Sequence, residues 1–99
     1  MRLRLRVVPN AEREIRTAAS WWRENRLAAP GLFHEELARG FELITTQPDL
    51  GTRYLDTHLS GVRRLHLYRI HYHLYYRVVD DEAEILAFWH TRRGQGPPI

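Results

Sequence analysis

The sequence has 99 residues, enough for one domain and too few for two. Hydrophobic residues make up 43% and charged residues 27%, an ordinary globular composition, and the absence of cysteine excludes disulfide bonds and zinc–thiolate sites. All 15 basic residues are arginine and the formal charge is +3, which favours acidic partners and leaves no lysine for Schiff-base chemistry.

No segment approaches the ~20 apolar residues that a membrane helix needs. The N-terminus alternates arginine with leucine and valine, whereas a signal peptide would carry a continuous apolar run. We therefore expect no membrane contact and a cytoplasmic location, which the lack of cysteine also favours.

The first half of the chain predicts a strand followed by two helices. Residues 1–8 alternate with period two, and Asn10 is a good helix N-cap. A helix is expected over residues 11–25 and a second over residues 32–45, with a short link between them that favours an antiparallel hairpin. Each helix has one apolar stripe: Ala11, Ile15, Ala18 and Trp22 in the first, and Phe33, Leu37, Phe41 and Ile44 in the second.

The second half of the chain predicts a meander of strands. Pro48 ends the second helix, and residues 48–61 read as a loop. Strands are expected over residues 62–67, 70–79 and 84–90, with an acidic turn at residues 80–82. In the last strand, Ile85, Ala87 and Trp89 are expected to share one face. Residues 94–99 are rich in glycine and proline and are expected to form a flexible tail.

These elements predict an α+β fold with the order β-α-α-β-β-β in a single domain over residues 1–99. The helix hairpin must pack on one face of a small antiparallel sheet to bury its two apolar stripes. The other face of the sheet is then left with arginine, histidine and tyrosine side chains.

Four segments follow one another along the chain: Gln47-Pro-Asp-Leu-Gly51, Val62-Arg-Arg-Leu65, Tyr75-Tyr-Arg-Val78 with its acidic turn, and Ile85-Leu-Ala-Phe-Trp-His-Thr-Arg-Arg93. Taken in this order, they resemble the RelE/ParE superfamily of toxins from bacterial type II toxin–antitoxin systems. The resemblance covers the chain except for its last few residues. It implies two helices on a small antiparallel sheet and a cognate antitoxin, ParD-like or other, that wraps the toxin with a segment that folds on binding. It also implies a hetero-oligomer that contacts operator DNA only through the antitoxin.

Two modes of action exist among relatives of this kind. RelE-like members cut messenger RNA on the ribosome, which requires a proton acceptor, a cation at the phosphate and a proton donor. The groups available for such chemistry here are Arg64, Arg77, His90 and Arg92. ParE-like members poison DNA gyrase, through its A subunit, without cleavage chemistry of their own.

The residues favour the ParE-like mode. No lysine is present to match those of the RelE-like members, and no tyrosine or histidine follows His90. Arginine is a poor general base because it does not lose its proton in proteins. Gyrase poisoning is therefore the preferred interpretation, and a ribosome-dependent endoribonuclease is the alternative.

Exposed aromatic and basic residues are candidates for contact with the target or the antitoxin, because such residues suit protein interfaces. The candidates are Trp21, Arg63, His71, His73, Tyr75, His90, Arg92 and Arg93. Trp22 lies on the apolar stripe of its helix and is expected in the core. His71 and His73 have the spacing of a metal pair on a strand, but no third ligand is evident, so we expect neither a metal nor a cofactor.

Overall fold

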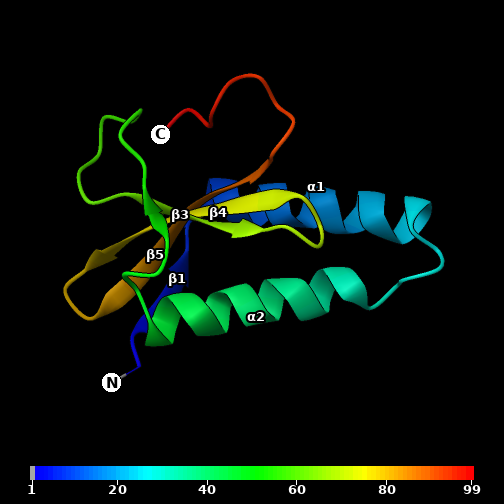
Figure 1. Cartoon of the computed structure of the whole chain (residues 1–99), viewed down its shortest axis with the longest axis horizontal. Coiled ribbons are helices and arrows are strands. Elements are labelled where there is room, and N and C mark those ends of the chain that lie inside the picture. The colour runs from blue at the N-terminus through cyan, green and yellow to red at the C-terminus, as the bar shows by residue number, and fades with distance from the viewer. Residues whose placement is uncertain (1) are drawn as a thin grey trace.

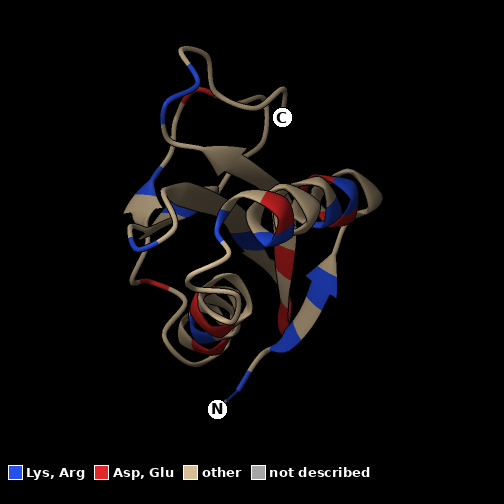
Figure 2. Ribbon diagram, turned by 90° about the vertical axis from the view of Figure 1, so that its right-hand side faces the viewer, with Lys and Arg blue, Asp and Glu red and all other residues tan. Residues whose placement is uncertain are grey.

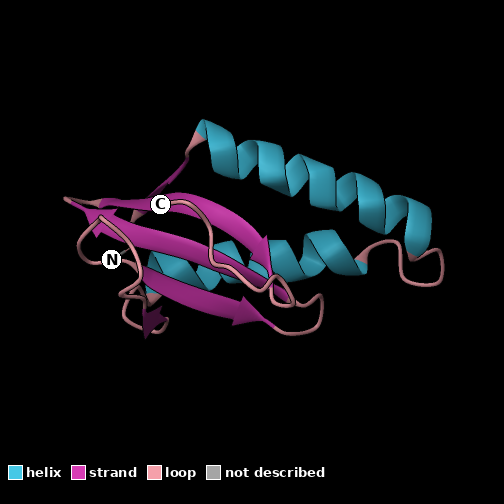
Figure 3. Cartoon of the chain, turned by 90° about the horizontal axis from the view of Figure 1, so that it is seen from above, coloured by secondary structure: helices cyan, strands magenta, loops and turns pink. Residues whose placement is uncertain are grey.

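A computed structural model of the chain describes residues 2–99 and contains two helices and one five-stranded sheet (Figure 1). In chain order the elements are β1 (Arg4–Val7), α1 (Pro9–Asn25), α2 (Leu32–Thr46), β2 (Thr52–Arg53), β3 (Arg63–Leu67), β4 (Tyr72–Val79) and β5 (Glu82–His90). Both helices lie on one side of the sheet (Figure 3). The predicted α+β fold and its helix hairpin are therefore confirmed. Within residues 2–99, no helix has the length and apolar character needed to cross a membrane.

The sheet has the order β1-β5-β4-β3-β2. Strands β3, β4 and β5 form the expected antiparallel meander, and β2 extends it with two antiparallel residue pairs. The first strand differs from the expectation, since β1 pairs with β5 in parallel. Alternation of apolar and polar residues is the same in parallel and antiparallel strands, so the parallel pairing could not be predicted from it.

The main core lies between the helices and the sheet. Both predicted stripes contribute to it, and Phe33 packs edge-on against Phe88 of β5, with 5.8 Å between the ring centroids. Gly40 lets α2 approach the sheet, because a Cβ atom there would lie 2.9 Å from side-chain carbons of Leu67 and Leu74. The apolar periodicity of the sequence therefore located the helix-facing core correctly.

A β-bulge changes the alternation in the middle of the sheet. The register of β4 on β5 shifts between Tyr75 and Tyr76, which pair with Ala87 and Ile85, so the extra residue is Leu86 of β5. The two tyrosines lie on opposite faces of the sheet and both are buried, at 2% and 1% exposure. Ile85 packs in the main core, whereas Ala87 and Trp89 belong to a second cluster on the outer face. The prediction that these three residues of β5 share one face was wrong, because a bulge inserts one extra residue and reverses the alternation beyond it.

The second cluster covers part of the outer face that was expected to be open. Val62, Tyr75, Leu86 and Ala87 form it, with Tyr54, Leu59 and Ile99 packed against them. The C-terminal segment reaches this cluster through hydrogen bonds from the Trp89 indole to the Gln95 carbonyl (2.7 Å) and from the His58 amide to the Ile99 carbonyl (3.3 Å). The expected flexibility of residues 94–99 stays a prediction, but the structure gives this segment defined contacts.

The helix boundaries follow proline and backbone geometry. Helix α1 begins at Pro9, which suits a first helical position because its missing N–H has no partner there in any case. Val8 is the N-cap and makes no side-chain cap, so the prediction of Asn10 as the cap was wrong. Asn10 lies inside the first turn, where its side-chain oxygen accepts a hydrogen bond from Arg13.

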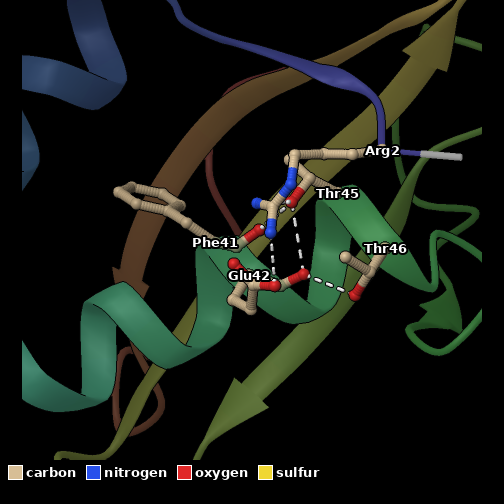
Figure 4. A network of polar contacts seen from close by, with 5 residues as sticks. All are labelled: Arg2, Phe41, Glu42, Thr45 and Thr46. Atoms are coloured by element: carbon tan, nitrogen blue, oxygen red, sulfur yellow. Dashed lines mark hydrogen bonds and ion pairs between the residues drawn. The ribbon is translucent and has the colours of Figure 1, made fainter.

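The start of the chain is joined to the end of α2 (Figure 4). The Leu3 amide donates to the Thr45 carbonyl (2.9 Å), and the Arg2 guanidinium forms an ion pair with Glu42 (2.6 Å). This ion pair raises the pKa of Arg2 and lowers that of Glu42 through a hydrogen bond between the two side chains. The Thr45 and Thr46 hydroxyls donate back to carbonyls of their own helix, which ends there. These contacts fix the entry of β1 at the edge of the sheet.

Candidate functional site

Two cavities meet at the end of the molecule where α1 ends, β4 begins and β5 ends. The larger has a volume of about 460 Å³ and runs between α1 and the last residues of β5. The smaller has a volume of about 220 Å³ and lies beside the β3–β4 turn. Trp21, Tyr72 and His90 line both cavities, so together they form one groove, which we call the Trp21 groove.

The end of α1 places an aromatic and a basic side chain at this groove. Trp22 is buried at 6% exposure and its indole donates to the Ala29 carbonyl (2.9 Å), which confirms the core position expected for it. Trp21, one residue earlier, points away from the core and is 46% exposed. The Arg26 guanidinium lies 5.2 Å from the Trp21 ring centroid and 5.8 Å from that of Trp22. A half-exposed tryptophan with a neighbouring arginine is typical of a protein contact site.

His90 stands at the centre of the groove. It lies opposite Tyr72 in the sheet, with 5.0 Å between the ring centroids, and its Nδ1 accepts a hydrogen bond from the Arg92 amide (3.1 Å). Burial lowers the pKa of His90 below its ordinary value, and the nearby His71, Arg92 and Arg93 lower it further. The imidazole is therefore neutral at pH 7 and presents a polar but uncharged surface to a partner.

Glu14 on α1 is a groove residue that the sequence reading missed. Its carboxylate accepts a hydrogen bond from the Phe88 amide (2.9 Å), at a point where β5 has lost β1 as its neighbour. Burial raises the pKa of Glu14, and this outweighs the opposite effects of the Phe88 hydrogen bond, Arg93 and Arg13. The only signal in the sequence was its position one residue before Ile15 on the apolar stripe, which does not identify its partner.

Of the candidate cleavage residues, Arg64 and His90 line one cavity of about 250 Å³, whereas Arg77 and Arg92 lie outside its lining. Leu74 packs in the main core, so the alternation of β3 and β4 places Arg64 on the outer face, whereas His90 lies opposite Tyr72 on the helix side. His90 pairs with Tyr72, and Arg77 lies five residues further along β4. At a rise of roughly 3.3 Å per residue, Arg77 is about 16 Å along the strand from His90. Its Nε donates to Glu84 (2.8 Å), which also accepts a hydrogen bond from Arg6. Arg92 lies beyond the end of β5 and is exposed.

Two of the candidate contact residues have structural roles. Tyr75 is 2% exposed in the second cluster, where Tyr54 covers it, so it is not available to a partner. Its predicted contact role is wrong, because sequence alternation alone does not show which surface a loop covers. Arg63 donates to the Gly51 carbonyl (2.7 Å) and to the Asp49 carbonyl (3.3 Å), and it thereby fixes the loop before β2. Its contact with a partner stays a prediction.

Of the remaining candidates, His71 and Arg93 line the Trp21 groove, whereas His73 lies outside it. His71 is exposed in the β3–β4 turn with a positive φ of 64°, and its carbonyl accepts from the Thr91 amide (2.9 Å). His73 is half-buried on the outer face, where burial, Arg64 and His66 lower its pKa to about 4. Arg93 lies over the Trp89 ring, 3.9 Å from its centroid. In the described part of the chain, no three histidine or acidic side chains gather as metal ligands would.

The Trp21 groove therefore combines aromatic and cationic surface. Trp21, Tyr72 and the Arg26 and Arg93 guanidinium groups offer apolar area and positive charge, which suit a peptide or protein partner that carries acidic groups. General acid–base chemistry would need a proton acceptor within hydrogen-bond reach of a cation. Arg64 and His90 line one outer-face cavity, but Arg77 is held by Glu84 outside it.

Comparison with known proteins gives one family and a consistent fold. The sequence profile described as "ParE toxin of type II toxin-antitoxin system, parDE" matches residues 5–94. No curated protein sequence matches the chain. A structure of the chromosomal ParDE TA system from P. aeruginosa is similar, with a TM-score of 0.68 and 17% identity over 91% of this chain and 97% of that one. A structure of the YoeB dimer from Staphylococcus aureus has a TM-score of 0.60 and 16% identity over 91% and 98% of the two chains.

Proposed function

The chain belongs to the ParE family of toxins of type II toxin–antitoxin systems, and from this premise we propose that it arrests growth by binding DNA gyrase, through the A subunit, rather than by cutting RNA. The structural likenesses do not separate these modes, because both neighbours share the fold at under 20% identity. The choice must therefore rest on the side chains.

The observation that carries the proposal is the incomplete assembly of the candidate cleavage residues. Arg77 is held by Glu84 far along β4, and Arg92 lies outside the cavity that Arg64 and His90 line. In-line attack by a 2′-hydroxyl needs its proton acceptor and its phosphate-binding cation within a few ångströms of one another. A poison needs only surface that binds the target, and the Trp21 groove supplies it.

A cognate antitoxin is the second partner that we propose. An antitoxin segment that folds on binding would gain most from aromatic side chains in apolar grooves with arginine at the rim. The Trp21 groove has this composition. We expect operator DNA to be contacted by the antitoxin within the hetero-oligomer, and not by this chain alone.

The proposal is tested with purified chain and purified gyrase on relaxed plasmid DNA. We expect loss of supercoiling and accumulation of cleaved plasmid, with both effects reversed by the antitoxin. In parallel, primer extension on messenger RNA from cells that express the chain should show no new codon-aligned ends. New ends, together with unaffected supercoiling at large molar excess, would establish the endoribonuclease instead.

Matched variants connect the activity to the groove. Trp21→Ala should raise the concentration needed for inhibition by about tenfold or more, the usual cost of losing a tryptophan at the centre of an interface. Leu27→Ala is the control, since Leu27 is 78% exposed on the neighbouring loop. Arg77→Gln should leave gyrase inhibition unchanged, whereas an RNA-cleaving mechanism that used Arg77 would lose activity.

A further inference from the structure

A third cavity lies on the outer face of the sheet and shares Trp89, His90 and Arg93 with the cavity between α1 and β5. Its volume is about 250 Å³, and it is open to solvent between the strands and the segment from Gly94 to Gly96. Its lining includes Tyr54, Arg64, His73, Trp89, His90 and Arg93. It is smaller than the roughly 300–1,000 Å³ of a drug-sized ligand site, so a small group fits rather than a whole cofactor.

The two arginines of this cavity have no carboxylate partner. Most arginines elsewhere are neutralised: on β1, Arg4 pairs with Asp81 (2.9 Å) and Arg6 with Glu84. Figure 2 shows blue segments on the strand after the N-terminus and red segments on the strand beside it. Among residues 2–99, neither Arg64 nor Arg93 has a carboxylate oxygen within 4.0 Å. Asp56 is the single acidic residue of the lining. With two arginines and one aspartate, the lining carries an excess of positive charge.

Both guanidinium groups are held in place by aromatic rings. Arg93 lies 3.9 Å from the Trp89 ring centroid, and Arg64 lies 5.6 Å from that of Tyr54. Stacking leaves the edge of a guanidinium free to donate hydrogen bonds, and this planar edge matches the oxygens of a phosphate. Because the rings already restrict these side chains, little conformational entropy remains to be lost on binding.

We propose that this cavity binds a phosphate group between the guanidinium groups of Arg64 and Arg93. The group can come from a free phosphate ester or from the backbone of a nucleic acid strand. No bond is made or broken, and the proposal does not depend on gyrase as the target. The half-buried His73 imidazole lies beside the same cavity and reports on its charge, since Arg64 helps to hold the pKa of His73 at about 4.

The first test is a titration of the purified chain with inorganic phosphate at constant ionic strength, followed by NMR of the Trp89 indole and the His73 ring. Saturable shifts confined to the cavity are expected. Arg64→Gln and Arg93→Gln should each weaken binding by about tenfold, the loss of one charge-assisted contact. Arg53→Gln is the control: Arg53 is exposed on β2 and outside the lining, and its removal changes the net charge equally. Equal weakening in all three variants, or shifts that do not saturate, would overturn the proposal.

A second readout needs no variant and remains valid if one of them misfolds. Bound phosphate should raise the pKa of His73 from its value of about 4, because an anion offsets the effect of Arg64. An unchanged His73 pKa at saturating phosphate would contradict the assignment. Adenosine monophosphate and a short single-stranded oligonucleotide then distinguish the sources, since tighter binding of either one at the same residues identifies which carries the phosphate.

Discussion

Glu14 is half-buried, and its carboxylate accepts a hydrogen bond from β5. Burial raises the pKa of this carboxyl, whereas the hydrogen bond lowers it. Its pKa is raised in the folded chain, so the folded state binds this proton more tightly than the unfolded state does. Stability associated with Glu14 is therefore present at low pH and is lost as the pH rises through its folded pKa. At pH 7 the carboxylate is charged and partly desolvated, so it lowers the free energy of unfolding.

This leads to a prediction for two substitutions. Glu14→Gln keeps an oxygen acceptor for the Phe88 amide and removes the charge, so it should increase the free energy of unfolding at pH 7 and lose this advantage below the pKa of the carboxyl. Glu14→Ala removes the acceptor and should destabilise by about 1–2 kcal/mol. Urea unfolding at pH 7 and at pH 4 measures both. A Gln variant less stable than the parent at pH 7 would contradict the raised pKa.

Between elements, Tyr76 joins β4 to the loop that follows α2. Its hydroxyl donates to the Pro48 carbonyl (2.7 Å) and accepts from the buried Gly51 amide (3.0 Å). Position 51 must be glycine, because a Cβ atom there would lie 2.5 Å from this hydroxyl and 2.9 Å from the Arg64 carbonyl. The contact between β4 and this loop therefore depends on the Tyr76 hydroxyl and on the absence of a side chain at Gly51.

We predict that Tyr76→Phe lowers the free energy of unfolding by about 1–3 kcal/mol, because the Gly51 amide is left buried without its acceptor. Tyr68→Phe is the matched control, since Tyr68 is 64% exposed and its hydroxyl can bond to water. Chemical denaturation measures the difference in free energy of unfolding, provided that its slope against denaturant concentration is the same for each variant and the parent. Equal effects of the two substitutions would show that the Tyr76 hydroxyl does not hold the loop.

The elements also show what could be predicted from the sequence. The helices and the meander were predictable because their apolar spacing reflects burial against a single core. The two-residue β2 was read as loop, since so short a strand has no periodicity of its own. The bulge at Leu86 of β5 could not be predicted, and it moved Ala87 and Trp89 to the face opposite that of Ile85.

The site was predictable only where exposure followed from a single element. Trp21 was recognised as exposed because it lies off the stripe of α1, and the groove around it confirms that position. The burial of Tyr75 and the hydrogen bonds of Arg63 could not be predicted, because their surroundings come from loops distant in sequence. The partner of Glu14 depends on where β1 ends beside β5, which is a property of the assembled sheet.

At the scale of the whole molecule, the chain has two cores on opposite faces of one sheet. The main core joins both helices to the sheet, while the second is closed by the C-terminal segment, with Pro97 buried and Ile99 packed against the cluster. Gly96 sets how closely this segment approaches, because a Cβ atom there would lie 2.1 Å from the Tyr54 hydroxyl. The second core can therefore be opened without disturbing the first.

Glycine substitutions test this independence. Gly96→Ala should displace the C-terminal segment, because Tyr54 is packed against Tyr75, with 4.8 Å between the ring centroids, and gives way less easily than a chain end. We expect loss of the Trp89 indole hydrogen bond, seen as a shift of its NMR signal, and a decrease of about 1–2 kcal/mol in the free energy of unfolding from re-exposed apolar surface. Far-ultraviolet circular dichroism should not change.

Two further variants decide the cause. Gly94→Ala is the matched control, since a Cβ atom at that position meets nothing within 4 Å, and it should resemble the parent. Adding Tyr54→Phe to Gly96→Ala removes the obstructing oxygen and leaves 3.3 Å to the nearest ring carbon, so it should restore the Trp89 signal. If neither the Trp89 signal nor the stability responds to Gly96→Ala, the segment is mobile in solution, as its glycine and proline content led us to expect. The segment from Gly94 to Gly96 would then form no fixed wall of the outer cavity. Binding of the proposed phosphate would depend on the Arg64 and Arg93 guanidinium groups alone.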